Sequence, residues 1–344
     1  MKTVLLTALK EMELSDIPEP KIEKDTDVLL KVEATGVCGS DVHYYETGRI
    51  GSQIVDYPFA VGHECSATVQ AVGDNVTKVK IGEPVVVEPS IACQSCDQCL
   101  QGREHTCRNV RFLGTPGQTD GCLCEYIVVP EQNCYPTYGD ISFEQGALCE
   151  PLSIGVYTIK RAGFNEGEKI AILGTGPIGL CVLLAAKLQN PGGIFLTDKI
   201  DTRLQTAQKL GATWSGNPDK TDIVNEILSA KPTGLDVVYE CCGQQDALDQ
   251  AIEILKPGGK LVIVGIPRDE RIFFSSDSFR RKELTVTYIR RQNHCTQAAI
   301  ESIRSGQIDV DFLVTHRFGL EETKTAFDLV AGYQDGVIKA MINI

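Results

Sequence analysis

The chain has 344 residues, 42% of them hydrophobic, and a formal net charge of -13 at pH 7. That length favours two domains, and the acidity argues against a nucleic-acid partner, because neutralising phosphates requires clustered Lys and Arg. No stretch approaches the roughly 18 uninterrupted apolar residues that span a bilayer, so we expect no membrane partner. Fourteen cysteines without a recognisable signal peptide indicate reduced thiols and a cytoplasmic protein.

The first 150 residues predict an antiparallel β domain. Short β-type runs alternate with turns rich in Gly and Pro, which is the pattern of strands joined by loops. The predicted strands are residues 28–34, 67–72, 84–87 and 126–129.

Four cysteines in this half follow the spacing C-x2-C-x2-C-x7-C. They are Cys93, Cys96, Cys99 and Cys107. Four thiolates can fill the tetrahedral coordination of one ion, so the pattern predicts a closed, structural Zn2+ site. The polar residues between them argue against a buried or disulfide-bonded cluster. An iron-sulfur cluster stays open as an alternative, because similar cysteine runs also hold such clusters.

Two other segments of the first half carry metal-binding side chains. Cys38 lies in one of them, and His63 and Glu64 are adjacent in the other. A thiolate, an imidazole and a carboxylate are good zinc ligands, and three ligands leave a fourth position for water or substrate. Taken singly, Cys38 is more often a small buried residue and His63 a histidine with ordinary hydrogen bonds.

From residue 169 onward, apolar strands alternate with helices. The predicted strands are residues 170–173, 194–197, 236–239, 261–264 and 284–289. Three helices are predicted: one that follows the first strand and ends at 189, one at 201–210 and one at 247–255. This alternation predicts an α/β unit with a doubly wound, mostly parallel sheet of the Rossmann type. Residues 290–344 do not extend the alternation, so we expect them to pack on the first domain.

A G-x-G-x-x-G loop joins the first of these strands to its helix. Its residues are Gly174, Thr175, Gly176, Pro177, Ile178 and Gly179. The glycines allow a tight turn and a close approach of pyrophosphate to the helix N-terminus. Asp198 closes the next strand, where a carboxylate accepts from the ribose 2'-hydroxyl and repels a 2'-phosphate, which favours NAD over NADP. Lys199 and Arg203 are nearby cations that could accommodate a phosphate, although Arg203 could equally stack on adenine or pair with Asp198.

Five segments together carry a family resemblance: GVCGSDVHYY, VGHE, CQSCDQCLQGREHTC, ALCEPLSIG and GTGPIG. They resemble the zinc-containing medium-chain dehydrogenase/reductase family and, within it, the polyol dehydrogenases that act on sorbitol, L-iditol or xylitol. The resemblance implies a GroES-like catalytic domain at 1–151 and 290–344, with a structural zinc lobe at about 89–110. It also implies an NAD-binding Rossmann domain at 152–289, two zinc ions per chain, and a homo-oligomer that is a dimer or a tetramer.

The same resemblance assigns the catalytic metal site. It implies Cys38, His63 and Glu64 as direct zinc ligands, with Glu150 near the metal-bound water. Alcohol dehydrogenases of this family place a cysteine ligand at the position of Glu150. Cys149 is therefore a rival, but the register of the segment EPLS points to Glu150.

The implied reaction oxidises a secondary hydroxyl of a polyol to a ketose and passes a hydride to NAD. Ser40 and His43 are suited to relaying the hydroxyl proton, although His43 could instead bond the cofactor ribose or a backbone carbonyl. The expected substrate contacts are Tyr44, Phe112, Glu150 and Arg290. The expected cofactor contacts, besides the glycine loop, are Asp198, Arg203, Val264, Ile266 and Arg290.

One residue departs from the polyol dehydrogenase pattern. Sorbitol dehydrogenases tend to have a tyrosine after the arginine that matches Arg290, whereas this chain has Arg291. A second guanidinium either faces solvent or a partner subunit, or reads a different polyol or an anionic sugar acid. Two other functions stay open. One is a dehydrogenase of another secondary alcohol, such as threonine, butanediol or a sugar acid, and the other is a catalytically silent NAD-binding or zinc-storage protein. The intact ligands and glycine loop argue against the silent protein.

Overall fold

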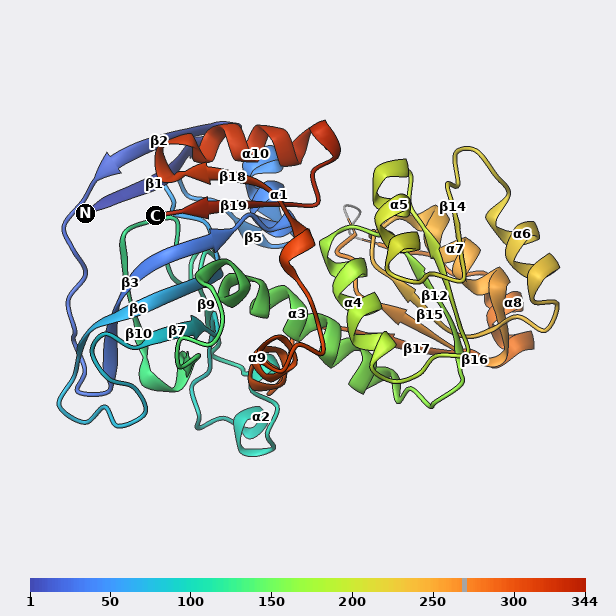
Figure 1. Cartoon of the computed structure of the whole chain (residues 1–344), viewed down its shortest axis with the longest axis horizontal. Helices are drawn as coiled ribbons and strands as arrows, with labels where there is room; N and C mark the ends of the chain where they lie inside the picture. The colour runs from blue at the N-terminus through green and yellow to red at the C-terminus, as the bar shows by residue number, and fades with distance from the viewer. Residues whose placement is uncertain (268–270) are drawn as a thin grey trace. The chain divides into compact units, whose positions relative to one another are not determined.

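The computed structural model describes residues 1–267 and 271–344 and divides the chain into two compact units. The first unit comprises Met1–Glu150 and Asn293–Ile344, and the second comprises Pro151–Gln292 (Figure 1). Within the described residues, no helix has the length and apolar character to cross a membrane.

The first unit is built on a seven-stranded sheet of order β11-β7-β6-β3-β19-β18, with β10 also paired to β3. Its strands are β3 (Asp27–Gly36), β6 (Glu64–Val72), β7 (Pro84–Val87), β10 (Tyr126–Pro130), β11 (Cys134–Pro136), β18 (Val314–Gly319) and β19 (Lys339–Asn343). β3 shows why the sequence folds this way: Val28, Leu30 and Val32 alternate with polar or partly exposed residues and are fully buried. β19 pairs antiparallel with β3, so the C-terminal segment completes the sheet.

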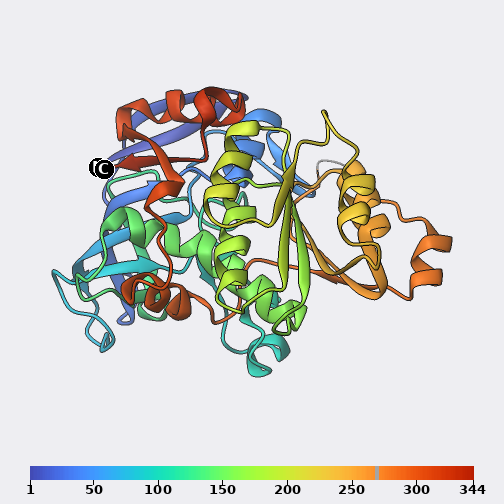
Figure 2. The same cartoon turned by 45° about the vertical axis from the view of Figure 1, so that its right-hand side comes forward.

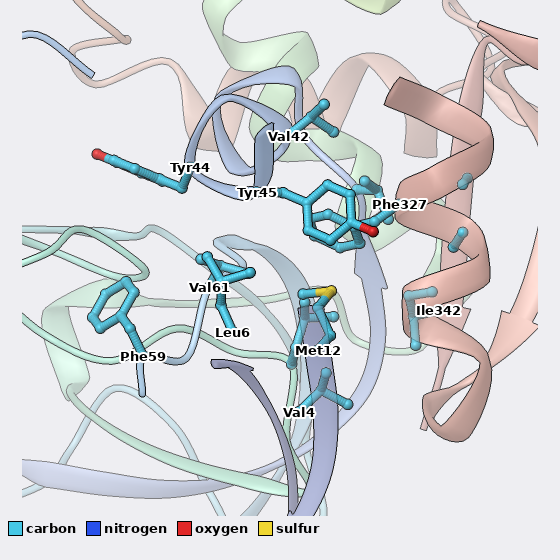
Figure 3. Close-up of a cluster of buried hydrophobic side chains, with 14 of the residues drawn as sticks. Val4, Leu6, Met12, Val42, Tyr44, Tyr45, Phe59, Val61, Phe327 and Ile342 are labelled. Carbon is cyan, nitrogen blue, oxygen red and sulfur yellow. The ribbon is translucent and has the colours of Figure 1, made fainter. Parts of the chain in front are cut away.

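An apolar cluster fastens the two ends of the chain to the first unit (Figure 3). It joins the hairpin of β1 (Lys2–Ala8) and β2 (Glu11–Asp16) to α1 (Gly39–Thr47) and α10 (Thr323–Ala331). At its centre the rings of Tyr45 and Phe327 meet edge to face, with centroids 5.4 Å apart. This geometry favours aromatic pairs beyond their buried area, so it supports the docking of the C-terminal helix.

The cysteine-rich segment lies between two short strands, β8 (Ser90–Ile91) and β9 (Arg111–Phe112), which pair antiparallel. The remaining elements of the first unit are β4 (Arg49–Ile50), β5 (Gln53–Ile54), α2 (Asp97–Leu100), α9 (Thr296–Arg304) and five short 3-10 helices, η1 (Glu104–Thr106), η2 (Glu131–Asn133), η3 (Asp311–Leu313), η4 (Leu320–Glu322) and η5 (Gln334–Gly336).

The second unit is a six-stranded parallel sheet of order β14-β13-β12-β15-β16-β17. Its strands are β12 (Lys169–Leu173), β13 (Gly193–Thr197), β14 (Trp214–Gly216), β15 (Leu235–Glu240), β16 (Leu255–Ile263) and β17 (Thr285–Tyr288). Its helices are α4 (Pro177–Lys187), α5 (Asp201–Lys209), α6 (Ile223–Ala230), α7 (Gln245–Ile254) and α8 (Ser276–Lys282). Helices α4 and α5 cover one face and α6, α7 and α8 the other (Figures 1 and 2). The predicted fold class, a Rossmann sheet with a β-rich domain, is confirmed.

Among the elements that were not predicted from the sequence, α3, β14 and α6 show why. The long helix α3 (Phe143–Ala162) contains Pro151, and a proline normally argues for a helix end. β14 has three residues and α6 has eight, so each gives too short a pattern to separate from a loop.

Candidate active site

The register of the first unit's sheet brings three ligand side chains together. Gly36, at the end of β3, lies opposite Glu64, the first residue of β6. Cys38 follows two residues after Gly36, and His63 directly precedes Glu64. The ligand atoms of Cys38, His63 and Glu64 all lie within 4.8 Å of one another. A thiolate, an imidazole and a carboxylate at this spacing fit a zinc ion with an open fourth position.

His63 is oriented by a carboxylate that the sequence analysis did not single out. Its Nδ1 lies 3.2 Å from Oδ1 of Asp41, and both residues are buried. Burial lowers the pKa of His63, but the charges of Asp41 and Cys38 outweigh it and raise the pKa well above its usual value. Because Nδ1 faces Asp41, Nε2 is left for a metal, and pairing with a carboxylate raises the basicity of such a ligand.

Ser40 lies beside two of the three ligands. Its Oγ is 3.3 Å from Sγ of Cys38 and 3.5 Å from Nε2 of His63. A hydroxyl can both accept and donate a proton, so this position suits a relay next to the site. His43, also on α1, is half-buried.

Glu64 is held by a second residue that the sequence did not reveal. Lys339 donates from Nζ to Oε1 at 2.8 Å and to Oε2 at 2.6 Å, and both residues are buried. Nothing in the spacing of the chain connects a lysine of the C-terminal strand to residue 64. Only the sheet order β6-β3-β19 brings the two side chains together.

Glu150 is buried in α3 and belongs electrostatically to the same group of residues. Burial raises its pKa to about 8, and the charges of Glu64 and Glu88 add to the rise while those of His63 and Lys339 oppose it. A bound dication would draw the carboxylate toward its ionised form. The rival Cys149 donates its thiol to the backbone oxygen of Gln145, 3.4 Å away.

The expected substrate residues differ in their burial, and they are divided between the two units. The ring of Phe112 packs beside His63, with centroids 5.2 Å apart. Tyr44 is buried, and its hydroxyl donates to Oε1 of Gln53 at 3.1 Å. Arg290 follows β17 in the second unit and is exposed, and Arg291 after it has a left-handed backbone with φ of 54°.

The four cysteines of the closed site form a compact group. The sulfur distances are 4.0 Å for Cys93 to Cys99, 3.6 Å for Cys96 to Cys99 and 3.9 Å for Cys96 to Cys107. Four sulfurs bound to one tetrahedral zinc lie about 3.8 Å apart, given a bond of about 2.3 Å. Disulfides are excluded, because every cysteine is free. A cluster of several irons would hold its sulfurs farther apart, so the geometry fits a single ion.

Hydrogen bonds to Cys93 and Cys107 favour their thiolates, whereas burial and bonds with Cys107 and Cys96 raise the pKa of Cys99 to about 12. The backbone and side chain of Ser95 lower the pKa of Cys93 to about 5. Backbone N-H groups of Cys93 and Asn109 donate to Sγ of Cys107 at 3.3 and 3.4 Å. These donors disperse the negative charge that four thiolates bring to one place.

The glycine loop of the second unit requires its glycines. Gly174 has a φ of 95°, and a Cβ at Gly179 would lie 1.9 Å from the carbonyl oxygen of Gly174. Gly176 precedes α4, which begins with Pro177 at a position where a missing N-H costs nothing. Free N-H groups at this helix start fit the phosphates of a dinucleotide.

Asp198 and Arg203 are both tied to this loop. Asp198 accepts from the backbone N-H of Thr175 at 2.7 Å and of Ile200 at 2.8 Å. Arg203 is buried, and its Nη1 lies 3.3 Å from where a Cβ on Gly176 would be. The carboxylate thus fixes the loop as well as standing at the end of β13, where a ribose is expected.

A further buried carboxylate, Glu240, fixes the neighbouring loop and was missed by the sequence analysis. Its Oε1 accepts from the backbone N-H of Cys242 at 2.7 Å and of Gly243 at 2.6 Å. A Cβ on Gly174 would lie 2.8 Å from that of Cys242, so the two loops touch. The backbone oxygen of Glu240 accepts from Val264 at 2.8 Å, while Ile266 is exposed.

Each unit also matches a family model. Residues 24–139 match the alcohol dehydrogenase GroES-like domain, and residues 177–305 match the zinc-binding dehydrogenase domain. With the fold and the two groups of metal-binding side chains, these matches define a zinc-binding dehydrogenase.

Individual relatives are similar over nearly the whole chain. Sorbitol dehydrogenase of Bacillus subtilis is 37% identical, with 99% of this chain and 97% of that protein covered. L-idonate 5-dehydrogenase of Vitis vinifera is 35% identical, with 92% and 88% covered. The crystal structure of 2R,3R-butanediol dehydrogenase from Bacillus subtilis is 31% identical and superposes with a TM-score of 0.90, covering 100% and 99%.

The chain belongs to the zinc-containing medium-chain dehydrogenase/reductase family, in its polyol dehydrogenase group. It is an enzyme, a zinc-dependent oxidoreductase that uses a nicotinamide dinucleotide, as the sequence predicted.

Proposed function

We propose that this enzyme oxidises a secondary hydroxyl of a polyol such as sorbitol, L-iditol or xylitol to the ketose and transfers the hydride to NAD. The observation that carries the proposal is the group of Cys38, His63 and Glu64, whose ligand atoms lie within 4.8 Å of one another and whose charges act on the buried carboxyl of Glu150. The full-length similarity to a sorbitol dehydrogenase supports the same substrate class.

The two units divide the work. A proposed catalytic domain at 1–151 and 290–344, which contains all of the first unit, holds both zinc ions, and a proposed Rossmann domain at 152–289 binds NAD. The enzyme acts as a cytoplasmic homo-oligomer, either a dimer or a tetramer. Four thiolates at 93, 96, 99 and 107 leave no open position, so their ion serves the fold, and the reaction belongs to the three-ligand site.

When bound at the three-ligand site, Zn2+ polarises the substrate hydroxyl and lowers its pKa toward neutrality. Ser40 then accepts the hydroxyl proton, because its Oγ lies next to both Cys38 and His63, and passes it toward His43 and solvent. Asp41 keeps the imidazole of His63 in the tautomer that presents Nε2. The buried ring of Phe112 beside His63 excludes water from this side of the site.

The polyol chain is bound by polar side chains. Glu150 accepts from a substrate hydroxyl, Tyr44 contacts the substrate, and Arg290 is the proposed donor of a fork of hydrogen bonds to vicinal hydroxyls. Asp198 selects NAD, since its carboxylate accepts from the 2'-hydroxyl and opposes a 2'-phosphate. Buried Arg203 lies beside Gly176 of the glycine loop.

A second substrate class is favoured by Arg291, which stands where sorbitol dehydrogenases tend to have tyrosine. A sugar acid would pair its carboxylate with this guanidinium, and the similarity to an L-idonate 5-dehydrogenase supports that alternative.

The test is NAD reduction by the zinc-loaded enzyme over a panel of sorbitol, xylitol, L-iditol, L-idonate, threonine and 2,3-butanediol. We expect the catalytic efficiency for at least one of the three polyols to be well above the efficiencies for L-idonate, threonine and 2,3-butanediol. The variant His63→Ala should lose this activity. The highest efficiency with L-idonate would replace polyols by sugar acids as the substrate class. A lack of turnover with the whole panel in zinc-loaded protein would contradict the proposal.

A further inference from the structure

A salt bridge lies buried against the three-ligand site. Lys339 and Glu64 have side chains that are 3% and 1% exposed, and the shortest N to O distance between them is 2.6 Å. Burying two charges is expensive unless their geometry is very good and their remaining hydrogen-bonding groups are satisfied.

The ammonium of Lys339 is fully engaged at this position. Its three hydrogens have three acceptors: Oε1 of Glu64 at 2.8 Å, Oε2 of Glu64 at 2.6 Å, and the backbone oxygen of Val37 at 3.1 Å. Both oxygens of one carboxylate are therefore held by the same cation. The third bond fixes the ammonium to the backbone immediately before Cys38.

The other side of the Glu64 carboxylate is closed by backbone. A Cβ placed on Gly36 would lie 2.3 Å from Oε2 of Glu64. The glycine thus provides the space that the carboxylate fills, and any larger residue there would push Glu64 aside. Gly36 and Lys339 together limit the directions in which the carboxylate can move.

Glu64 has capacity for both a lysine and a metal. An ionised carboxylate offers about four lone-pair sites, and Lys339 uses two of them. Every contact to the ammonium withdraws negative charge from the oxygens, which weakens their bond to an ion held by Cys38 and His63. A weakly held carboxylate can loosen or give up its own bond to the ion when a hydroxyl enters the open fourth position, whereas a carboxylate without the ammonium would stay firmly bound.

Lys339 offsets part of a negative charge that a divalent ion alone does not neutralise. Cys38 as thiolate and the buried carboxylates of Asp41, Glu64 and Glu150 bring four negative charges, against two on a dication. Without the lysine, the buried carboxylate of Glu64 would lose the cation that contacts both of its oxygens.

From this geometry we infer that Lys339 is a positioning residue that keeps Glu64 a weak, displaceable ligand of the catalytic metal. The inference rests on the proposed metal site, not on the identity of the polyol. Lys339 touches neither substrate nor cofactor in this role, and it acts only through the carboxylate of Glu64.

The experiment measures zinc release into excess chelator from the purified holoenzyme, comparing the unmodified chain with Lys339→Met. Methionine has a similar length and no charge. In this variant Glu64 loses its ammonium partner, and both of its oxygens become available to the ion. We expect release from the three-ligand site to slow about tenfold, within the range by which partners of metal ligands alter affinity. Release from the four-cysteine site is the control inside the same molecule and stays unchanged.

Two further variants separate positioning from a structural role. Lys339→Arg keeps the cation and should release zinc within about twofold of the unmodified chain. Lys339→Met with Glu64→Gln removes both charges of the buried pair, so it retains the better chance of folding. It should show no slowing, because the effect runs through the carboxylate. Replacement of the catalytic zinc by Co2+ adds a spectroscopic readout. The visible absorption bands of Co2+ depend on its ligands, so they should differ between the unmodified chain and Lys339→Met, in which Glu64 binds the ion more firmly.

Each outcome has a distinct meaning. Slower release in Lys339→Met that disappears in the double variant supports the inference. Unchanged or faster release in folded Lys339→Met overturns it and leaves the proposed function standing. If the unmodified chain binds no metal at Cys38, His63 and Glu64, the proposed function fails and the inference fails with it. None of these measurements requires a substrate or NAD.

Discussion

The two groups of metal-binding side chains in the first unit are assembled in opposite ways. The four cysteines come from one loop between β8 and β9, and two of them are only half-buried. The three-ligand site is gathered from the end of β3 and the start of β6, with Glu150 from α3 and Lys339 from β19. A local loop can bind its ion almost independently of the sheet. The assembled site depends on the register of three strands, so it can be tuned by residues far away in the chain.

The largest expected difference between the two sites is their response to chelation. A mild chelator should remove nearly all dehydrogenase activity and lower the zinc content from about two ions per chain to about one, because only the open site has an exchangeable position. Elemental analysis alongside the activity assay checks this. Added Zn2+ should restore turnover, and active protein that contains one ion or none would contradict the assignment of two sites.

The next largest effect is expected from the partner of His63. Asp41→Asn keeps the shape of the side chain but loses the charge that holds Nδ1, 3.2 Å away. We expect zinc affinity at the three-ligand site to fall about tenfold, the lower end of the usual cost of losing such a partner. Competitive metal titration measures it, with the four-cysteine site as the internal control. Unchanged affinity and turnover would show that Asp41 does not orient the ligand.

Loss of a ligand from the four-cysteine site should lower the stability of the protein and leave its rate per active site almost unchanged. Cys99 is a buried member of the lobe, and Cys99→Ser removes one thiolate from its ion. We expect the midpoint of thermal unfolding to drop by several degrees while the rate per folded, zinc-loaded active site stays within about twofold. Calorimetry with active-site counting separates the two quantities. Cys134→Ser, in a buried cysteine outside both sites, is the matched control for losing a thiol.

The contrast between local and assembled features also explains what the sequence could predict. The four-cysteine spacing and the glycine loop are contiguous, so their chemistry is visible without a fold. The pairing of Lys339 with Glu64 joins residues from opposite ends of the first unit, and no periodicity reports it. Glu240 was missed for a related reason: at the end of a buried strand it looks like an ordinary terminator, and its bonds to Cys242 and Gly243 appear only in the folded loop.

Helix α3 shows how tertiary structure overrides a local signal. Pro151 argues for a helix end, yet the helix continues through it from Phe143 to Ala162. Cys149 and Leu152 on either side are fully buried, so packing holds the helical path. The family resemblance identified Glu150 by its register within the segment EPLS, whereas local propensity would have placed it at a helix terminus.

The smallest expected effect concerns the contact that fastens α3 to the C-terminal strands. Glu144 accepts from Nη2 of Arg317 on β18 at 2.7 Å and from Nδ2 of Asn343 on β19 at 3.2 Å. The hydrogen bond from Arg317 lowers the pKa of Glu144 below its usual value. The folded state therefore binds this proton less readily than the unfolded state, whose carboxyl titrates at about 4.3.

This lowered pKa fixes the sign of the pH dependence. The stabilisation from Glu144 is fully present above about pH 5 and disappears as the pH falls through the folded-state pKa below about 4.3. Because Arg317 is half-exposed, we expect Glu144→Gln to cost less than about 1 kcal/mol at pH 7 and close to nothing in acid. Denaturant unfolding at pH 7 and at the lowest pH that preserves the fold measures the cost under both conditions, with exposed Glu226→Gln on α6 as the charge-loss control.

The same variant also tests the comparison of the two metal sites. The three-ligand site, built partly from β19, should release zinc slightly faster in Glu144→Gln, whereas the four-cysteine loop should not respond. A cost that stays constant across pH would mean that the residue acts through packing and not through its charge.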